Sequence, residues 1–98
     1  MPRIQGLTES GLLTTDTLLK TGKGYVFSIT IAWAGATAGD KVYLRDGTTG
    51  AAAIEVVFVL SAATGTLHQE WTQGKEFEVG IFYGEGTTSD VSTELTYK

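Results

Sequence analysis

The sequence lacks cysteine and asparagine, and it contains one proline and one histidine. Without cysteine, neither a disulfide framework nor a thiolate zinc site can hold the chain together, so its stability must come from packing or from a partner. Without asparagine, the chain has no N-glycosylation acceptor, and its turns must rely on glycine, aspartate, threonine and serine. The thirteen glycines fit that use.

Long apolar runs and clustered basic residues are also missing. No apolar stretch reaches the roughly 18 residues that span a bilayer, and residues 1–10 lack the apolar segment of a signal peptide, so we expect cytoplasmic synthesis and no membrane partner. The net charge is −4, and residues 47–98 carry two basic and seven acidic groups. Binding to a phosphate backbone needs lysine and arginine clustered on one surface, so we expect no nucleic-acid partner.

The clearest strand pattern lies in residues 25–33, YVFSITIAW, where large apolar residues alternate with other residues. This alternation predicts a strand whose one face carries Phe27, Ile29, Ile31 and Trp33. At 98 residues the chain can bury one core, and we expect this strand to seed it.

Six other segments have strand character: 14–20, 41–45, 53–60, 66–71, 76–83 and 91–97. Small-residue or polar stretches separate them, namely KTGKG at 20–24, AGATAGD at 34–40, DGTTG at 46–50, SAATG at 61–65, TQGK at 72–75 and GEGTTSD at 84–90. The Asp46–Gly47 pair is a hairpin signal. The segment 53–60 is apolar on both faces apart from Glu55, which predicts a central strand covered on both sides along part of its length.

Seven strands spaced about ten residues apart, with no helical period, indicate an all-β fold. We predict a small antiparallel β-sandwich, jelly-roll-like or immunoglobulin-like, over residues 14–98. Residues 1–13 show neither period and are expected to form an N-terminal arm. Such an arm either packs on its own domain or docks on a neighbouring subunit.

No group of residues has the pattern of a catalytic or metal site. His68 lies in mid-strand on the face that it shares with Glu70, which favours a solvated cross-strand position over a general base. No GxSxG motif occurs, Glu76 and Glu78 are expected on an open face, and the aspartates in loops lack the density of a calcium site. We therefore expect no enzyme activity, no cofactor and no metal.

Aromatic and branched side chains on the outward faces of strands are the remaining lead. Tyr25, Tyr43 and Phe82 point off the core face, and exposed aromatic residues bind sugars or fill protein interfaces. Val57 and Val59 are also unfavourable in water and indicate a subunit contact or a covering arm. Trp33 and Trp71 are assigned to the core.

Three parts of the chain resemble a family of short proteins from tailed-bacteriophage virions. They are GYVFSITIAWAGATAGDKVYLRDG at 24–47, ATGTL at 63–67 and FEVGIFYGEGTTSDVSTELTYK at 77–98. The resemblance implies a small β-sandwich that is a structural component of the virion. The family role that it suggests is a head decoration (cement) protein, located on the capsid surface and bound to the major capsid protein.

The interface residues expected for that role come from the arm and from the outward aromatic residues. We expect capsid contact through Ile4, Leu7, Leu12 and Leu13, and self-association through Tyr43 or Phe82, as a trimer at local threefold positions. Two alternatives remain open: a carbohydrate-binding or adhesin module, and a tail or connector structural protein.

Overall fold

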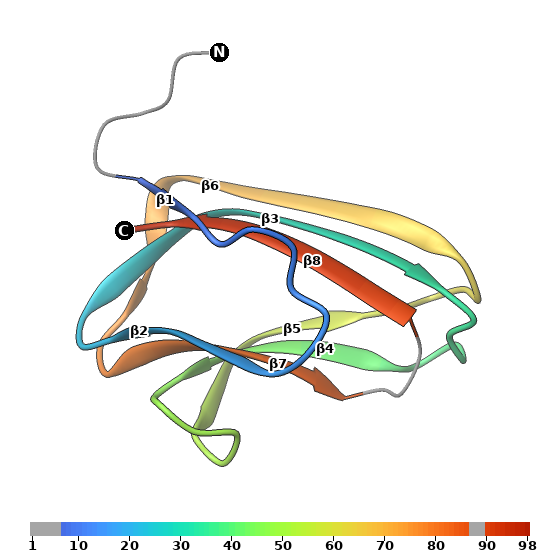
Figure 1. Ribbon diagram of the computed structural model, residues 1–98, viewed down its shortest axis with the longest axis horizontal. Helices are drawn as coiled ribbons and strands as arrows, with labels where there is room; N and C mark the ends of the chain where they lie inside the picture. Colours follow the sequence, from blue (N-terminus) through green and yellow to red (C-terminus); the bar gives the residue numbers. More distant parts are fainter. Residues whose placement is uncertain (1–6, 87–89) are drawn as a thin grey trace.

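The computed structural model describes residues 7–86 and 90–98, and throughout these residues the chain is all-β. Two antiparallel four-stranded sheets pack face to face (Figure 1), which confirms the predicted β-sandwich. Sheet I has the order β1-β8-β3-β6 and sheet II has the order β2-β7-β4-β5. The strands are β1 (Thr8–Glu9), β2 (Thr17–Thr21), β3 (Gly24–Ala34), β4 (Lys41–Asp46), β5 (Ala53–Val59), β6 (Gly65–Phe77), β7 (Gly80–Gly86) and β8 (Asp90–Tyr97).

The pairing of the strands is nested. β4 pairs with β5, β3 with β6, β2 with β7 and β1 with β8. The chain therefore behaves as one long hairpin rolled up into two sheets, which is the double Greek-key connectivity of a jelly roll. Of the two predicted types of sandwich, the jelly-roll-like one has this strand order.

The core lies between the sheets and is lined on the sheet I side by β3. Val26, Ile29 and Ile31 are fully buried there. The prediction that Phe27 shares a face with Ile29, Ile31 and Trp33 is wrong, because a bulge interrupts the pairing of β3 with β6 between Val26 and Ser28. The bulge reverses the alternation, so Val26 points inward and Phe27 is only half-buried.

The apolar segment 53–60 is not a central strand. It forms β5, whose only partner in sheet II is β4. Phe58 and Leu60 enter the core, whereas Val57 and Val59 lie on the outer side and are about half exposed. The prediction of cover on both sides is therefore wrong for the single chain, in which the outer face of β5 stays exposed at Val57 and Val59.

The turn predicted at 72–75 is also wrong. β6 continues through these residues to Phe77, with Gly74 at a φ of 87°, and the chain reverses at Glu78 and Val79 instead. The side chain of Asp46 accepts hydrogen bonds from the backbone N–H groups of this reversal. The predicted strand at 76–83 is thus divided between the end of β6 and β7.

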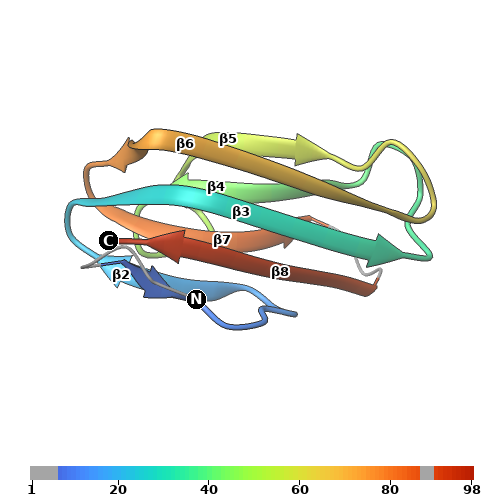
Figure 2. The same cartoon turned by 90° about the horizontal axis from the view of Figure 1, so that it is seen from above.

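The two sides of the sandwich, where the edge strands of the sheets lie, differ from each other (Figure 2). On one side, the segment from Ser10 to Asp16 crosses from β1 in sheet I to β2 in sheet II. Leu13 on this segment is buried in the core and exchanges two backbone hydrogen bonds with Thr93, of 2.7 and 2.9 Å. On the other side, where the β5 and β6 edges lie, Glu55 and Lys75 form an ion pair at 3.6 Å.

Candidate functional site

The outer face of sheet II carries most of the exposed apolar side chains that the structure describes. Large apolar residues that are at least two fifths exposed number six in the described ranges, and four of them lie on this face. They are joined there by two half-buried aromatic residues. We call this surface the apolar face and define it by Leu18, Tyr43, Ile54, Val57, Val59 and Phe82.

The strand register brings these residues together in rows. Phe82 on β7 lies opposite Leu18 on β2 and Arg45 on β4. Arg45 in turn pairs with Ile54 on β5. Two residues before Arg45 on β4, Tyr43 pairs with Val57. The apolar face therefore spans all four strands of sheet II.

Gly86 on β7 leaves room for the ring of Tyr43 to lie across this surface. A Cβ at Gly86 would stand 2.6 Å from Cε2 of Tyr43, so the ring occupies the space that a side chain would need. The guanidinium of Arg45 lies 5.0 Å from the centre of the Tyr43 ring and donates a hydrogen bond of 2.8 Å to the carbonyl of Ala52. These contacts position Tyr43 and Arg45 before any partner binds.

The apolar face continues to an open strand edge at β5. An edge strand presents unpaired N–H and C=O groups, and proteins usually protect long edges with charges or proline. β5 has the sequence AIEVVFV, with Glu55 as its one charged residue. An apolar face that ends in an apolar edge is the arrangement of a surface that another protein covers.

The predicted interface residues that the structure describes range from the exposed surface to the core. Tyr43 and Phe82 lie on the apolar face, on adjacent strands. In the predicted arm, Leu12 is 68% exposed, Leu7 is half-buried and Leu13 lies in the core, so its side chain is not at the surface. Ile4 lies outside the described residues.

Sequence reasoning identified Val57 and Val59 as unfavourable in water but missed Leu18 and Ile54. In TLLK, the adjacent pair Leu18 and Leu19 does not reveal which side chain points outward. A bulge between Leu18 and Lys20 decides it. Ile54 is turned outward by a second irregularity, between Leu44 and Arg45. The alternation of apolar and polar residues along each strand does not indicate either bulge.

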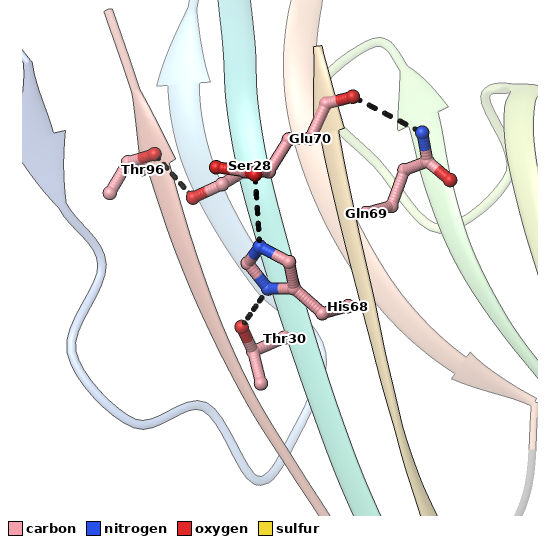
Figure 3. A network of polar contacts seen from close by, with 6 residues as sticks. All are labelled: Ser28, Thr30, His68, Gln69, Glu70 and Thr96. Carbon is pink, nitrogen blue, oxygen red and sulfur yellow. Dashed lines mark hydrogen bonds and ion pairs between the residues drawn. The ribbon is translucent and has the colours of Figure 1, made fainter.

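The outer face of sheet I is polar and carries the one histidine (Figure 3). The Thr30 hydroxyl lies 2.7 Å from Nδ1 of His68, and the Ser28 and Thr96 hydroxyls are 2.6 Å apart. Nε2 of His68 is 3.7 Å from the Glu70 carboxylate, which is longer than a hydrogen bond. His68 and Glu70 are both exposed, so these contacts have the character of solvated cross-strand pairs.

A buried polar cluster joins the two sheets near the segment that carries Leu13. The Tyr83 hydroxyl donates a hydrogen bond of 2.7 Å to Glu85 and lies 2.6 Å from the Thr93 hydroxyl. Burial raises the pKa of Tyr83. Burial also raises the pKa of Glu85, although the hydrogen bond from Tyr83 acts in the opposite direction. The cluster lies inside the fold and satisfies its own polar groups.

The described residues contain no group of three or more histidine, cysteine, aspartate or glutamate side chains that could hold a metal ion. Within the same ranges, no helix is long and apolar enough to cross a membrane. Comparisons of the chain with protein families, with curated proteins and with solved structures found no match.

Proposed function

We propose that the protein is a non-enzymatic structural protein of a virion, a decoration (cement) protein that binds the major capsid protein and stabilises the head. The observation that carries this proposal is the apolar face, with its open β5 edge. A rigid sandwich with such a surface acts by burying it against a neighbour, here a second copy of the chain, and a cement protein links neighbouring capsomers through buried surfaces of this kind.

Two further points support the proposal. Residues 24–47, 63–67 and 77–98 resemble short virion proteins of tailed bacteriophages. Jelly rolls are also common among viral capsid domains, although lectin domains use them as well, so this second point is an analogy.

The proposal divides the surface into two interfaces. The apolar face, including Tyr43 and Phe82, mediates self-association, and a trimer suits local threefold positions on a capsid. The exposed Leu12 and the half-buried Leu7 belong to the capsid contact, because they lie before and after β1 and outside the strands of sheet II.

Electron microscopy of tailed-phage particles that encode the chain, labelled with antibodies against it, tests the location. Label over the head surface is the expected result. Label confined to the tail would overturn the head assignment in favour of a tail or connector protein, and unlabelled particles that still expose other structural proteins to antibodies would overturn the virion role.

Self-association is tested by placing a charge on the apolar face. We predict that Val57→Glu weakens the oligomer at least a hundredfold, because a carboxylate buried without a partner costs several kcal/mol. The control is Thr66→Glu, which adds the same charge to the exposed outer face of sheet I. Light scattering coupled to size-exclusion chromatography measures the mass of each. A wild-type chain that stays monomeric at 100 µM, or an unchanged oligomer of the Val57 variant, would contradict this interface.

A further inference from the structure

A hollow of about 340 Å³ opens at the end of the sandwich where β2 turns into β3. Its lining combines three lysines, two aromatic residues and one amide: Lys20, Lys23, Tyr25, Phe27, Gln73 and Lys98. These residues come from both sheets and from three separate parts of the chain. In Figure 1, the end of β8 lies beside the start of β3, which brings Lys98 to this place.

Backbone contacts fix the walls of the hollow. The backbone of Lys98 exchanges two hydrogen bonds with that of Tyr25, of 2.9 and 2.8 Å. The side chain of Lys20 lies over Gly24, where a Cβ would stand 2.8 Å from its Cδ. The hollow is therefore built by the fold and does not depend on freely moving surface side chains alone.

The aromatic wall is a product of the bulge in β3. The bulge turns Phe27 out of the core, next to Tyr25. On the opposite strand, Gly74 leaves room for the ring, since a Cβ there would stand 3.0 Å from Cζ of Phe27. The positive φ of Gly74 also favours glycine at this position. The two aromatic rings thus line the same side of the hollow.

The hollow concentrates positive charge on an acidic protein. It holds three of the seven lysine and arginine residues of a chain whose net charge is −4. Lys23 is paired with Glu76 at 2.9 Å. In the described part of the chain, neither Lys20 nor Lys98 has an ion pair with a carboxylate. Two ammonium groups therefore remain available to an anion.

We infer that this hollow binds an acidic saccharide, a sugar ring that carries a carboxylate or a sulfate. Ammonium groups bind such anions as point charges, and aromatic faces accept the apolar face of a sugar ring. The amide of Gln73 offers both donors and an acceptor for hydroxyl groups. The volume is at the lower end of the range for ligand sites, which suits one or two sugar rings.

Glu76 and Glu78 limit the ligand to a short one. Glu76 pairs with Lys23, and Glu78 follows at the turn into β7, so the rim beyond Lys23 is acidic. A long polyanion that extended past this rim would be repelled. This argues for recognition of a single charged residue or a short oligosaccharide, and against a strand of nucleic acid.

The inference is tested by titrating the ¹⁵N-labelled chain with four probes at 50 mM salt, followed by NMR. The probes are a hyaluronan tetrasaccharide for carboxylates, a heparin tetrasaccharide for sulfates, uncharged maltotetraose and inorganic sulfate. We expect the amides of Tyr25, Phe27 and Gln73 to shift with one or both acidic sugars, and binding to weaken at 200 mM salt. Which acidic sugar binds more tightly identifies the anionic group.

Matched variants complete the test. The double variant K20Q/K98Q should weaken binding at least tenfold, as should Tyr25→Ala, whereas Lys41→Gln, at the far end of β4, should leave it unchanged. The inference is overturned if neither acidic sugar shifts these amides at 10 mM, or if inorganic sulfate binds as tightly as the sulfated sugar. Tighter binding of adenosine monophosphate in a parallel titration would also overturn it, in favour of a nucleotide site.

Discussion

The side chain of Asp46 stabilises a different chain reversal from the hairpin turn that the sequence predicts at Asp46 and Gly47. The Asp-Gly pair predicts a hairpin turn, and a loop from 47 to 52 does follow β4. The carboxylate itself, however, accepts hydrogen bonds from the backbone N–H groups of Glu78, Val79 and Gly80, at 3.1, 2.8 and 3.3 Å. It therefore stabilises the reversal between β6 and β7.

We predict that Asp46→Ala lowers the free energy of unfolding by about 1–2 kcal/mol at pH 7, because three backbone donors lose their acceptor. Burial acts to raise the pKa of Asp46, but the three donors outweigh it and the pKa lies below its ordinary value. A lowered carboxyl pKa stabilises the fold above the unfolded-state pKa of about 4, and this contribution is lost as the pH falls through the folded-state pKa. Urea unfolding at a series of pH values measures the difference between the two chains.

The control for this prediction is Asp46→Asn, which keeps one oxygen acceptor and removes the titratable proton. The difference between the wild type and either variant should be largest at neutral pH and should shrink below pH of about 4. A difference that grew on acidification would contradict the assignment of the carboxylate as the acceptor.

At the scale of elements, the two-residue period predicts strands well where nothing interrupts them. Val42 and Leu44 on β4, and Val91 and Leu95 on β8, are buried as their alternation indicates. The predicted facing of Phe27 fails at a shift of register in β3, and the facing of Leu18, which the local pattern leaves undecided, is set by a shift of register in β2. A bulge is decided by the partner strand and not by the local pattern, so a single strand read alone cannot reveal it.

At the start of β7, backbone atoms of neighbouring segments leave no room for a side chain on Gly80. A Cβ there would stand 2.7 Å from the carbonyl oxygen of Gly47 and 2.8 Å from that of Lys20, both of them backbone atoms. We predict that Gly80→Ala destabilises the fold by about 1–3 kcal/mol, because the start of β7 must move away from its neighbours.

Thermal unfolding followed by circular dichroism measures this cost against Gly50→Ala. A Cβ at Gly50 would meet nothing closer than Phe82, at 3.8 Å, so this control should change the stability by less than about 0.5 kcal/mol. Equal stability of the two variants would contradict the close packing of Gly80 against the backbone of Gly47 and Lys20.

At the scale of the whole molecule, the sequence predicts the class of fold but not which residues meet. The nested pairing of β4–β5 out to β1–β8 brings Lys98 beside Lys20 and Lys23, and no local spacing signals such a cluster. The apolar face is an intermediate case. The sequence AIEVVFVL already indicates that Val57 and Val59 face outward. The edge position of β5, which exposes them, follows from the strand order of sheet II. The local pattern therefore predicts which side chains share a face of a strand. The topology decides which surfaces and clusters the strands form together.

The segment that links the two sheets carries the last prediction. Leu12 and Leu13 are neighbours on it, yet Leu12 is 68% exposed whereas Leu13 is buried and paired with Thr93. We predict that Leu13→Ala lowers the free energy of unfolding by about 2–4 kcal/mol, because it leaves a cavity where one side of the sandwich closes. Leu12→Ala should change it by less than about 0.5 kcal/mol. Chemical denaturation of the two variants separates a structural role from a binding role. If the protein binds a capsid through this region, the Leu12 variant should lose affinity while keeping its stability, and an equal loss of stability in both variants would contradict the placement of Leu13 in the core.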